Sequence, residues 1–173
     1  MLSIILAISL ITSPDTTTIQ SMQNISYRVF ANDSSLYFQY KTNRNWTVPI
    51  TIDKGNISEY AMTATSGDYV HIVWCKDGRV YYKINYVPIT PQFIRDNKEP
   101  KWVYNVVVSP SFSEPAKDLS IFARNDFVFV DWKCPMENDS NNNELWRRGG
   151  LIIPGNLTCW YDPQNITEIP SSK

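Results

Sequence analysis

Two stretches of this chain follow the same pattern 58 residues apart: residues 67–74, Gly-Asp-Tyr-Val-His-Ile-Val-Trp, and residues 125–132, Asn-Asp-Phe-Val-Phe-Val-Asp-Trp. Each has a turn pair that ends in Asp, then an aromatic residue, then β-branched residues on one face, and then Trp. Internal similarity at a fixed long period indicates a repeat architecture, in which each copy is one supersecondary unit. The alternation within each copy has the period of a β-strand, so we predict repeated units made of strands.

Turn signals along the chain indicate short antiparallel strands. Residues 35–41 alternate between the two faces of a strand. Residues 69–75 and 79–85 flank a Lys-Asp-Gly turn and are predicted to form a hairpin. We interpret the proline-bearing, polar residues 86–101 as a long loop. Near the C-terminus we expect short strands at residues 144–147, 151–153 and 157–161.

The predicted strands recur in one order. A short strand comes first, then the strand that ends in Trp, then a strand of Tyr-Tyr-Lys type. That third place is held by residues 36–41, 80–83 and 145–147. Trp46 and Trp102 open the fourth place in the first two units. With eleven prolines and only six glycines, the chain offers little room for long helices, so we expect an all-β fold.

Composition limits the classes of partner. Aromatic residues make up 13% of the chain and charged residues 19%, which is typical of a folded domain. The net charge is −1 and the charges are interspersed, so we expect no nucleic-acid partner. No CxxC spacing occurs, and we expect neither a metal site nor a cofactor. Past the first residues, no apolar run is long enough to cross a bilayer, so we expect no membrane span in the mature chain.

The first residues resemble a secretory signal. Residues 2–11 form an apolar run of the length of a signal core, and a Thr tract follows it. We therefore predict a signal peptide over residues 1–18 and a β domain over residues 19–173. The alternative is a buried first strand, since no Lys or Arg precedes the run.

Seven Asn-x-Ser/Thr sequons support export, where composition alone predicts about two or three. The candidate glycosylation sites are Asn24, Asn32, Asn45, Asn56, Asn138, Asn156 and Asn165. The alternative is an Asn-rich composition in an organism that does not glycosylate. On the export reading, the protein is a secreted or extracellular glycoprotein.

Three cysteines, Cys75, Cys134 and Cys159, allow at most one internal disulfide. Cys134 and Cys159 share the C-terminal segment and are the candidate pair. Cys75 directly follows Trp74 at a strand end and is interpreted as a small buried residue.

Four segments carry a resemblance to a known family. Residues 35–41, 45–49, 67–74 and 77–83 resemble sialidase-type β-propeller repeats, and the likeness covers roughly residues 27–148. In that family each blade has four antiparallel strands, with an Asp-box turn of Ser-x-Asp-x-Gly-x-x-Trp type between the third and fourth. Here the turn at residues 42–46 keeps Trp46 but lacks the Asp and Gly of the box. The resemblance is thus to a degenerate and incomplete repeat.

The resemblance implies a partial β-propeller of about two to three four-stranded antiparallel blades, because closed propellers need at least four blades. A β-sandwich built from similar hairpins is the alternative. An incomplete ring leaves a terminal apolar face and open edge strands. We therefore expect either self-association or shielding of these surfaces by glycans.

Catalytic residues are not assigned. Sialidase chemistry would need three arginines around a carboxylate, a Tyr–Glu nucleophilic pair and an acid. Seven arginines are present, but none lies in a local motif that matches the family's arginines. His71, the only histidine, lies in mid-strand at the place that Phe129 holds in the other copy, and we interpret it as a packed or surface residue.

Three aromatic side chains are candidates for stacking on a sugar or a partner: Tyr37, Tyr81 and Trp146. Ordinary packing between blades is the competing explanation. The sequence as a whole favours an exported, non-catalytic β-propeller-like module that binds a protein or glycan. The alternatives are a fragment of a sialidase-like glycoside hydrolase and a secreted β-sandwich recognition domain.

Overall fold

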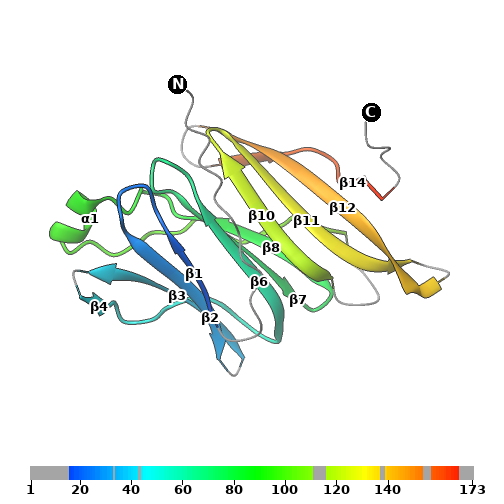
Figure 1. Cartoon of the computed structure of the whole chain (residues 1–173), viewed down its shortest axis with the longest axis horizontal. Coiled ribbons are helices and arrows are strands. Elements are labelled where there is room, and N and C mark those ends of the chain that lie inside the picture. Colours follow the sequence, from blue (N-terminus) through cyan, green and yellow to red (C-terminus); the bar gives the residue numbers. More distant parts are fainter. Residues whose placement is uncertain are drawn as a thin grey trace.

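Three antiparallel sheets, formed one after another along the chain, lie side by side in the molecule (Figure 1). We describe them from a computed structural model that covers residues 16–32, 34–42, 44–110, 116–136, 139–153 and 157–167. The predicted all-β fold is confirmed. Among these residues the strands form open sheets of four or five strands and no closed barrel, an arrangement consistent with a partial propeller or a sandwich.

Each sheet follows the chain in order. Sheet 1 contains β1 (Thr17–Gln20), β2 (Ser26–Asn32), β3 (Ser35–Thr42), β4 (Asn45–Trp46) and β5 (Ile50–Lys54), with β4 and β5 both paired to β3. Sheet 2 contains β6 (Ile57–Ala64), β7 (Val70–Lys76), β8 (Arg79–Ile84) and β9 (Val106–Val107). Sheet 3 contains β10 (Lys117–Arg124), β11 (Phe127–Met136), β12 (Asp139–Ile153), β13 (Leu157–Trp160) and β14 (Gln164–Asn165), with β14 paired to β12.

The hairpin expected around the Lys-Asp-Gly turn is confirmed. Strands β7 and β8 pair antiparallel, with Lys76 opposite Arg79. Asp77 and Gly78 between them have φ values of 51° and 69°. Positive φ at both central residues is what a tight hairpin turn of the primed type requires, and Asp-Gly supplies it at low cost.

The loop expected at residues 86–101 contains one short helix, α1 (Pro91–Arg95). Thr90 caps it, since the Thr90 side chain accepts a hydrogen bond from the Phe93 N–H, and Pro91 begins the first turn. A Thr-Pro start is a recognised helix signal, but the segment is too short to show a helical period.

Sheet 2 is buried on both faces. On β7, the side chains of Val70, Ile72 and Trp74 pack against sheet 1, while Val73 and Cys75 pack against sheet 3. Sheets 1 and 3 each bury one face in these clusters. The sheets therefore form a stack with an internal member and two terminal members.

The repeat seen in the sequence has a structural counterpart. Trp74 on β7 lies opposite Tyr81 on β8, and Trp132 on β11 lies opposite Trp146 on β12. Both tryptophans lie on the second strand of their sheet and pack toward the sheet before it. Their equivalent placement confirms the prediction that the two segments are copies of one unit.

The predicted domain boundary falls inside a strand. Thr17 and Thr18 belong to β1 and lie opposite Val29 and Arg28 on β2, and the Thr17 side chain is buried. A chain that begins at residue 19 would therefore lack half of β1. Residues 1–15, which hold the predicted leader, lie outside the described residues. Within the described part of the chain, no helix has the length and apolar character that a membrane crossing requires.

Candidate binding surfaces

The outer side of sheet 3 is the first candidate. Along β11, Val128, Val130 and Trp132 point into the core toward sheet 2, so Phe127 and Phe129 point the other way. We call this second side the sheet 3 open face. Its residues include Phe122, Arg124, Phe127, Phe129, Asp131, Arg147 and Tyr161.

Four aromatic side chains form a cluster on the sheet 3 open face. Phe122 lies directly opposite Phe129 in the β10–β11 ladder, and Phe127 follows two residues away on the same side. Their exposed fractions are 42% for Phe122, 46% for Phe127 and 36% for Phe129, and Tyr161 is 56% exposed. An exposed apolar patch of this kind on a sheet indicates an interaction surface.

Gly149 on β12 makes this cluster continuous. It lies opposite Phe129, and the Tyr161 N–H donates to its carbonyl. A Cβ at this position would be 3.1 Å from Phe129 Cε1 and 3.5 Å from Tyr161 Cδ2. The two rings thus flank the glycine and cover its backbone from both sides.

An ion pair borders the aromatic cluster. Arg147 Nη2 lies 2.7 Å from Asp131 Oδ2, and Arg147 Nε donates to Asp131 Oδ1 at 2.8 Å. These hydrogen bonds, which Arg147 donates to Asp131, raise the pKa of Arg147 above its already high value. The Arg147 guanidinium also lies 5.7 Å from the centre of the Phe129 ring. The face therefore combines an apolar half with a neutralised charged half.

The outer side of sheet 1 is the second candidate. Tyr27, Val29, Leu36 and Phe38 fill the core toward sheet 2, which leaves Phe30 and Tyr37 on the opposite side. We call this side the sheet 1 open face, made of Arg28, Phe30, Tyr37, Trp46 and Thr51. The rings of Phe30 and Tyr37 stack with centres 5.5 Å apart.

Arg28 organises the sheet 1 open face. Its guanidinium lies 4.3 Å from the centre of the Trp46 ring and 5.5 Å from that of Phe30. Its Nε donates to Gln39 Oε1 at 2.7 Å, and Gln39 Nε2 in turn donates to the Thr47 carbonyl. A planar cation held between aromatic rings presents a rigid surface. Because its side chains are already ordered in the free protein, binding a partner would cost little further conformational entropy.

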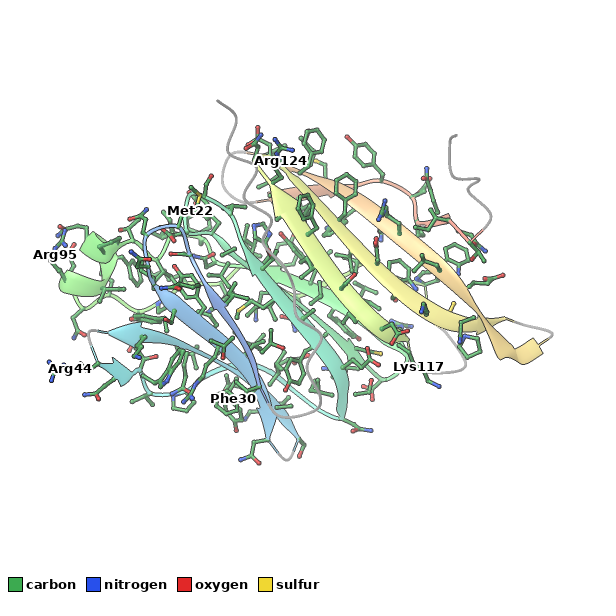
Figure 2. All side chains as sticks on the ribbon, viewed as in Figure 1. Met22, Phe30, Arg44, Arg95, Lys117 and Arg124 are labelled. Carbon is green, nitrogen blue, oxygen red and sulfur yellow. The ribbon has the colours of Figure 1, made fainter. Side chains whose placement is uncertain are left out.

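The two open faces lie apart. The labelled Phe30 and Arg124 are on opposite sides of the molecule in Figure 2. They belong to the first and last sheets of the stack, with sheet 2 between them (Figure 1).

The three predicted stacking residues occupy one equivalent position in three sheets. Tyr37, Tyr81 and Trp146 each lie on the third strand, opposite Phe30, Trp74 and Trp132 of the second strand. Tyr81 stacks on Trp74 with ring centres 5.7 Å apart, inside the contact between sheets 1 and 2. Trp146 packs into the contact between sheets 2 and 3. Of the three, Tyr37 alone lies on an open face.

Sequence reasoning missed Phe122, Phe127, Phe129 and Tyr161. In β11 both faces read as apolar, which is also the pattern of a strand buried on two sides. A signal for the open face is found when the two repeated segments are compared. Val73 and Cys75 of the first segment correspond to Asp131 and Lys133 of the second. Charged residues at those two positions indicate that the last sheet does not bury this face fully.

Five sequon asparagines lie in the described residues, and all five are exposed: Asn24, Asn32, Asn45, Asn56 and Asn165. Asn138 and Asn156 lie outside the described residues. Asn45, beside Trp46, is exposed in spite of its place at a strand end. Exposure is the physical requirement for a glycan acceptor, and it is met at each of the five.

The candidate disulfide is not formed in this structure, where Cys75, Cys134 and Cys159 are free. Cys134 lies opposite Glu144 on β12 and is buried, while Cys159 lies opposite Leu151 and is exposed. Seven residues along a strand correspond to roughly 23 Å, far beyond the reach of a disulfide. Burial raises the pKa of the Cys134 thiol, and the Glu144 carboxylate adds to that effect. Cys75 is buried, as expected.

His71 is a core residue. It is fully buried, and a hydrogen bond of 2.9 Å links its Nδ1 to the Tyr82 hydroxyl. Burial lowers the pKa of His71 to about 3, so the ring is neutral at physiological pH. A ring enclosed in this way has no access to a substrate, in agreement with its interpretation as a packed residue.

The arginines are spread over the molecule. Figure 2 shows Arg44 and Arg95 near the sheet 1 side and Arg124 at the end of β10. Arg147 binds Asp131, and Arg148 donates to the carbonyls of Tyr161 and Val108 from the other face of β12. These partners hold the guanidinium groups in separate environments.

One pocket, of about 360 Å³, lies between the β1–β2 turn, the end of β3 and α1. Its lining includes Gln23, Asn24, Lys41 and Arg95. Because Asn24 is a sequon asparagine in its wall, a glycan there would stand at the pocket mouth. In the described part of the chain, no three His, Cys, Asp or Glu side chains gather closely enough to hold a metal ion.

Comparison with known proteins gives no match for this chain. No family model matches it, and neither a curated protein nor a solved structure matches it.

Proposed function

We propose that this chain is an exported, non-catalytic recognition module of degenerate β-propeller type, and that it binds a protein partner through the sheet 3 open face. The observation that carries the proposal is the cluster of Phe122, Phe127, Phe129 and Tyr161, each more than a third exposed on one side of a sheet. Aromatic residues with an arginine beside them are the composition that protein interfaces favour.

A protein fits this surface better than a glycan does. The cluster is a sheet face several strands wide, whereas a sugar site is a concave pocket with convergent polar groups. In addition, no sequon of the described residues lies on this face: Asn165 is opposite Trp146, whose side chain packs toward sheet 2. A glycan at Asn165 would leave the cluster free for a partner.

Export is the part of the proposal that rests on the leader and the sequons. The five described sequon asparagines are all exposed, which supports glycosylation in a secretory pathway. A secreted recognition module would explain why the chain has exposed aromatic side chains gathered on one side of a sheet.

The test is binding to an array of extracellular protein domains that includes this chain itself, with a glycan array in parallel. We expect the purified chain to bind at least one protein domain, and the Phe127→Ser, Phe129→Ser double variant to lose that binding at least tenfold. Tyr104→Ser is the matched control, because Tyr104 is 71% exposed but lies in the segment between α1 and β9. Binding that survives the double variant, or binding to glycans alone, would contradict the proposal.

A further inference from the structure

We infer that the partner of the sheet 3 open face is the sheet 1 open face of a second copy of this chain, and that two copies close head to tail into one ring of six sheets. The inference deepens the proposed function and rests on it, because the sheet 3 open face supplies half of the contact.

The contacts inside the molecule show how each sheet packs against the sheet before it. In sheets 2 and 3, a cross-strand aromatic pair faces the preceding sheet: Trp74 with Tyr81, and Trp132 with Trp146. Both tryptophans are fully buried there. The pair is thus the part of each sheet that is covered by its predecessor.

Sheet 1 has the same aromatic pair, and within the described part of the chain no sheet precedes it. Phe30 and Tyr37 lie opposite each other on the second and third strands, at the place of Trp74 and Tyr81. Their rings stack at 5.5 Å, much as those of Trp74 and Tyr81 stack at 5.7 Å. The first sheet therefore has the same contact surface as an internal sheet, although no sheet of the described residues comes before it.

Sheet 3 has the complementary surface, and among the described residues no sheet follows it. Its open face is on the side that in sheets 1 and 2 packs against the following sheet. At the far end of this face an ion pair, Asp131 with Arg147, stands where sheet 2 has Val73 and Tyr82. Such a half-apolar, half-charged surface tolerates water in the free chain and suits a contact that forms reversibly.

The size of the faces is sufficient for a dimer. Strands β3 and β10 have eight residues each. The smaller face is that of sheet 1, where β1, β2, β3 and β5 have 4, 7, 8 and 5 residues. With a rise of about 3.3 Å per residue and a spacing of about 4.8 Å between strands, this face covers roughly 400 Å². Closure makes two such contacts, so each chain would bury roughly 800 Å², within the range of specific dimers.

Two copies of the chain are the number expected to close the ring. The three sheets that the described residues form give six in the pair, and propellers typically have four to eight blades. A contact between unlike faces continues into a filament unless rotation closes it, and two-fold closure is the commonest solution among soluble oligomers.

The experiment is size-exclusion chromatography with light scattering on residues 16–173, which keep β1 whole, produced without glycans and with one variant for each face. Phe127→Arg blocks the sheet 3 open face. Thr51→Arg blocks the sheet 1 open face, because Thr51 is exposed and lies opposite Tyr37. Both positions are accessible enough for the variants to fold, which circular dichroism and thermal unfolding would verify. Tyr104→Arg is the control away from both faces.

We expect the wild type and the Tyr104→Arg control to have twice the mass of one chain, and each face variant to have half of that. We also expect an equimolar mixture of the two face variants to regain the double mass, because one intact face of each kind remains. Monomeric wild type at every soluble concentration, or a mass of three or more copies, would overturn the inference. So would Thr51→Arg remaining a dimer while Phe127→Arg is a monomer, although the proposed function of the sheet 3 open face would then stand.

Discussion

Single side chains join neighbouring sheets, and Asp53 is the clearest case. Its carboxylate on β5 of sheet 1 accepts hydrogen bonds from Trp74 Nε1 at 2.9 Å and Lys76 Nζ at 2.8 Å, both on β7 of sheet 2. Burial alone would raise the pKa of Asp53, but these hydrogen bonds and one from the Lys54 N–H outweigh it and hold the pKa below its usual value. The repeated Trp is thus anchored by polar contacts as well as by packing.

We expect Asp53→Ala to lower the free energy of unfolding by about 2–3 kcal/mol, because it leaves the buried Trp74 N–H without this acceptor. The measurement is urea unfolding followed by tryptophan fluorescence. Lys133→Ala is the control, since the Lys133–Asp118 pair has the same 2.8 Å separation but both side chains are about half exposed. An exposed pair of this kind contributes less than about 0.5 kcal/mol. Equal losses in the two variants would contradict the assigned role of Asp53.

His71 predicts how stability depends on pH. Its pKa is about 3 when folded and about 6.5 when unfolded, so below pH 6.5 the unfolded chain binds more protons. The contribution of neutral His71 to the free energy of unfolding is therefore fully present above pH 6.5. It is lost as the pH falls toward 3, by about 1 kcal/mol per pH unit. Because His71 is the only histidine, the loss between pH 7.5 and pH 5.5 is assigned to it. Urea unfolding of His71→Gln should show a much flatter dependence over this interval, and an unchanged slope would refute the assignment.

At the scale of the element, sequence predicted strands best where turn chemistry marks their ends. The β7–β8 hairpin was predictable because Asp77 and Gly78 suit the positive φ values of its turn. The last part of the chain was read as separate short strands, whereas β12 runs unbroken from Asp139 to Ile153. Glycines usually interrupt strands, so Gly149 and Gly150 suggested a break. Their role depends on rings from other strands, which no local pattern reveals.

The two glycines of β12 offer a matched pair of substitutions. A Cβ on Gly150 would be 2.5 Å from Thr158 Cγ2 and 3.0 Å from Trp160 Cε3, inside the packed side of sheet 3. Trp160 is held there by an edge contact with Tyr82, with ring centres 4.9 Å apart. We therefore expect Gly150→Ala to cost about 1–3 kcal/mol in the free energy of unfolding.

Gly149 is the neighbouring residue, and a Cβ there would lie on the opposite side of the sheet. We expect Gly149→Ala to lower the free energy of unfolding by less than about 1 kcal/mol. Its Cβ would be 3.1 Å from Phe129, whose ring is partly exposed and has room to move. Thermal unfolding of both variants measures the difference. A larger loss for Gly149→Ala would show that the open face is packed more rigidly than the buried one.

At the scale of the whole molecule, the repeat in the sequence predicted the kind of sheet and the expectation of an open end, but not which faces stay open. Tyr37, Tyr81 and Trp146 looked alike as candidate stacking residues because they are equivalent. Only the stacking order, with sheet 2 in the middle, separates Tyr37, which lies on an open face, from Tyr81 and Trp146, which pack between sheets. For these three residues the difference follows from the contacts between sheets, and their neighbours in the sequence do not reveal it.

The sequons connect the open faces to glycosylation. Asn32 lies two residues beyond Phe30 on β2, on the side of the sheet 1 open face, and is exposed. A glycan at Asn32 would stand at the border of this face and obstruct a second copy. Asn56 is also exposed, but it joins β5 to β6 between sheets 1 and 2. The two sites therefore should differ in their effect on association.

We expect Asn32→Gln, produced in a glycosylating host, to contain more of the double-mass species than the wild type at equal concentration. Asn56→Gln, which removes one glycan elsewhere, should leave the proportion unchanged. Enzymatic deglycosylation of the wild type should then raise its dimer fraction to that of Asn32→Gln, because the same obstruction is removed. Light scattering across a dilution series gives the fractions. Equal fractions for the two variants would mean that the glycan at Asn32 does not reach the contact, and that the second copy approaches sheet 1 from another side.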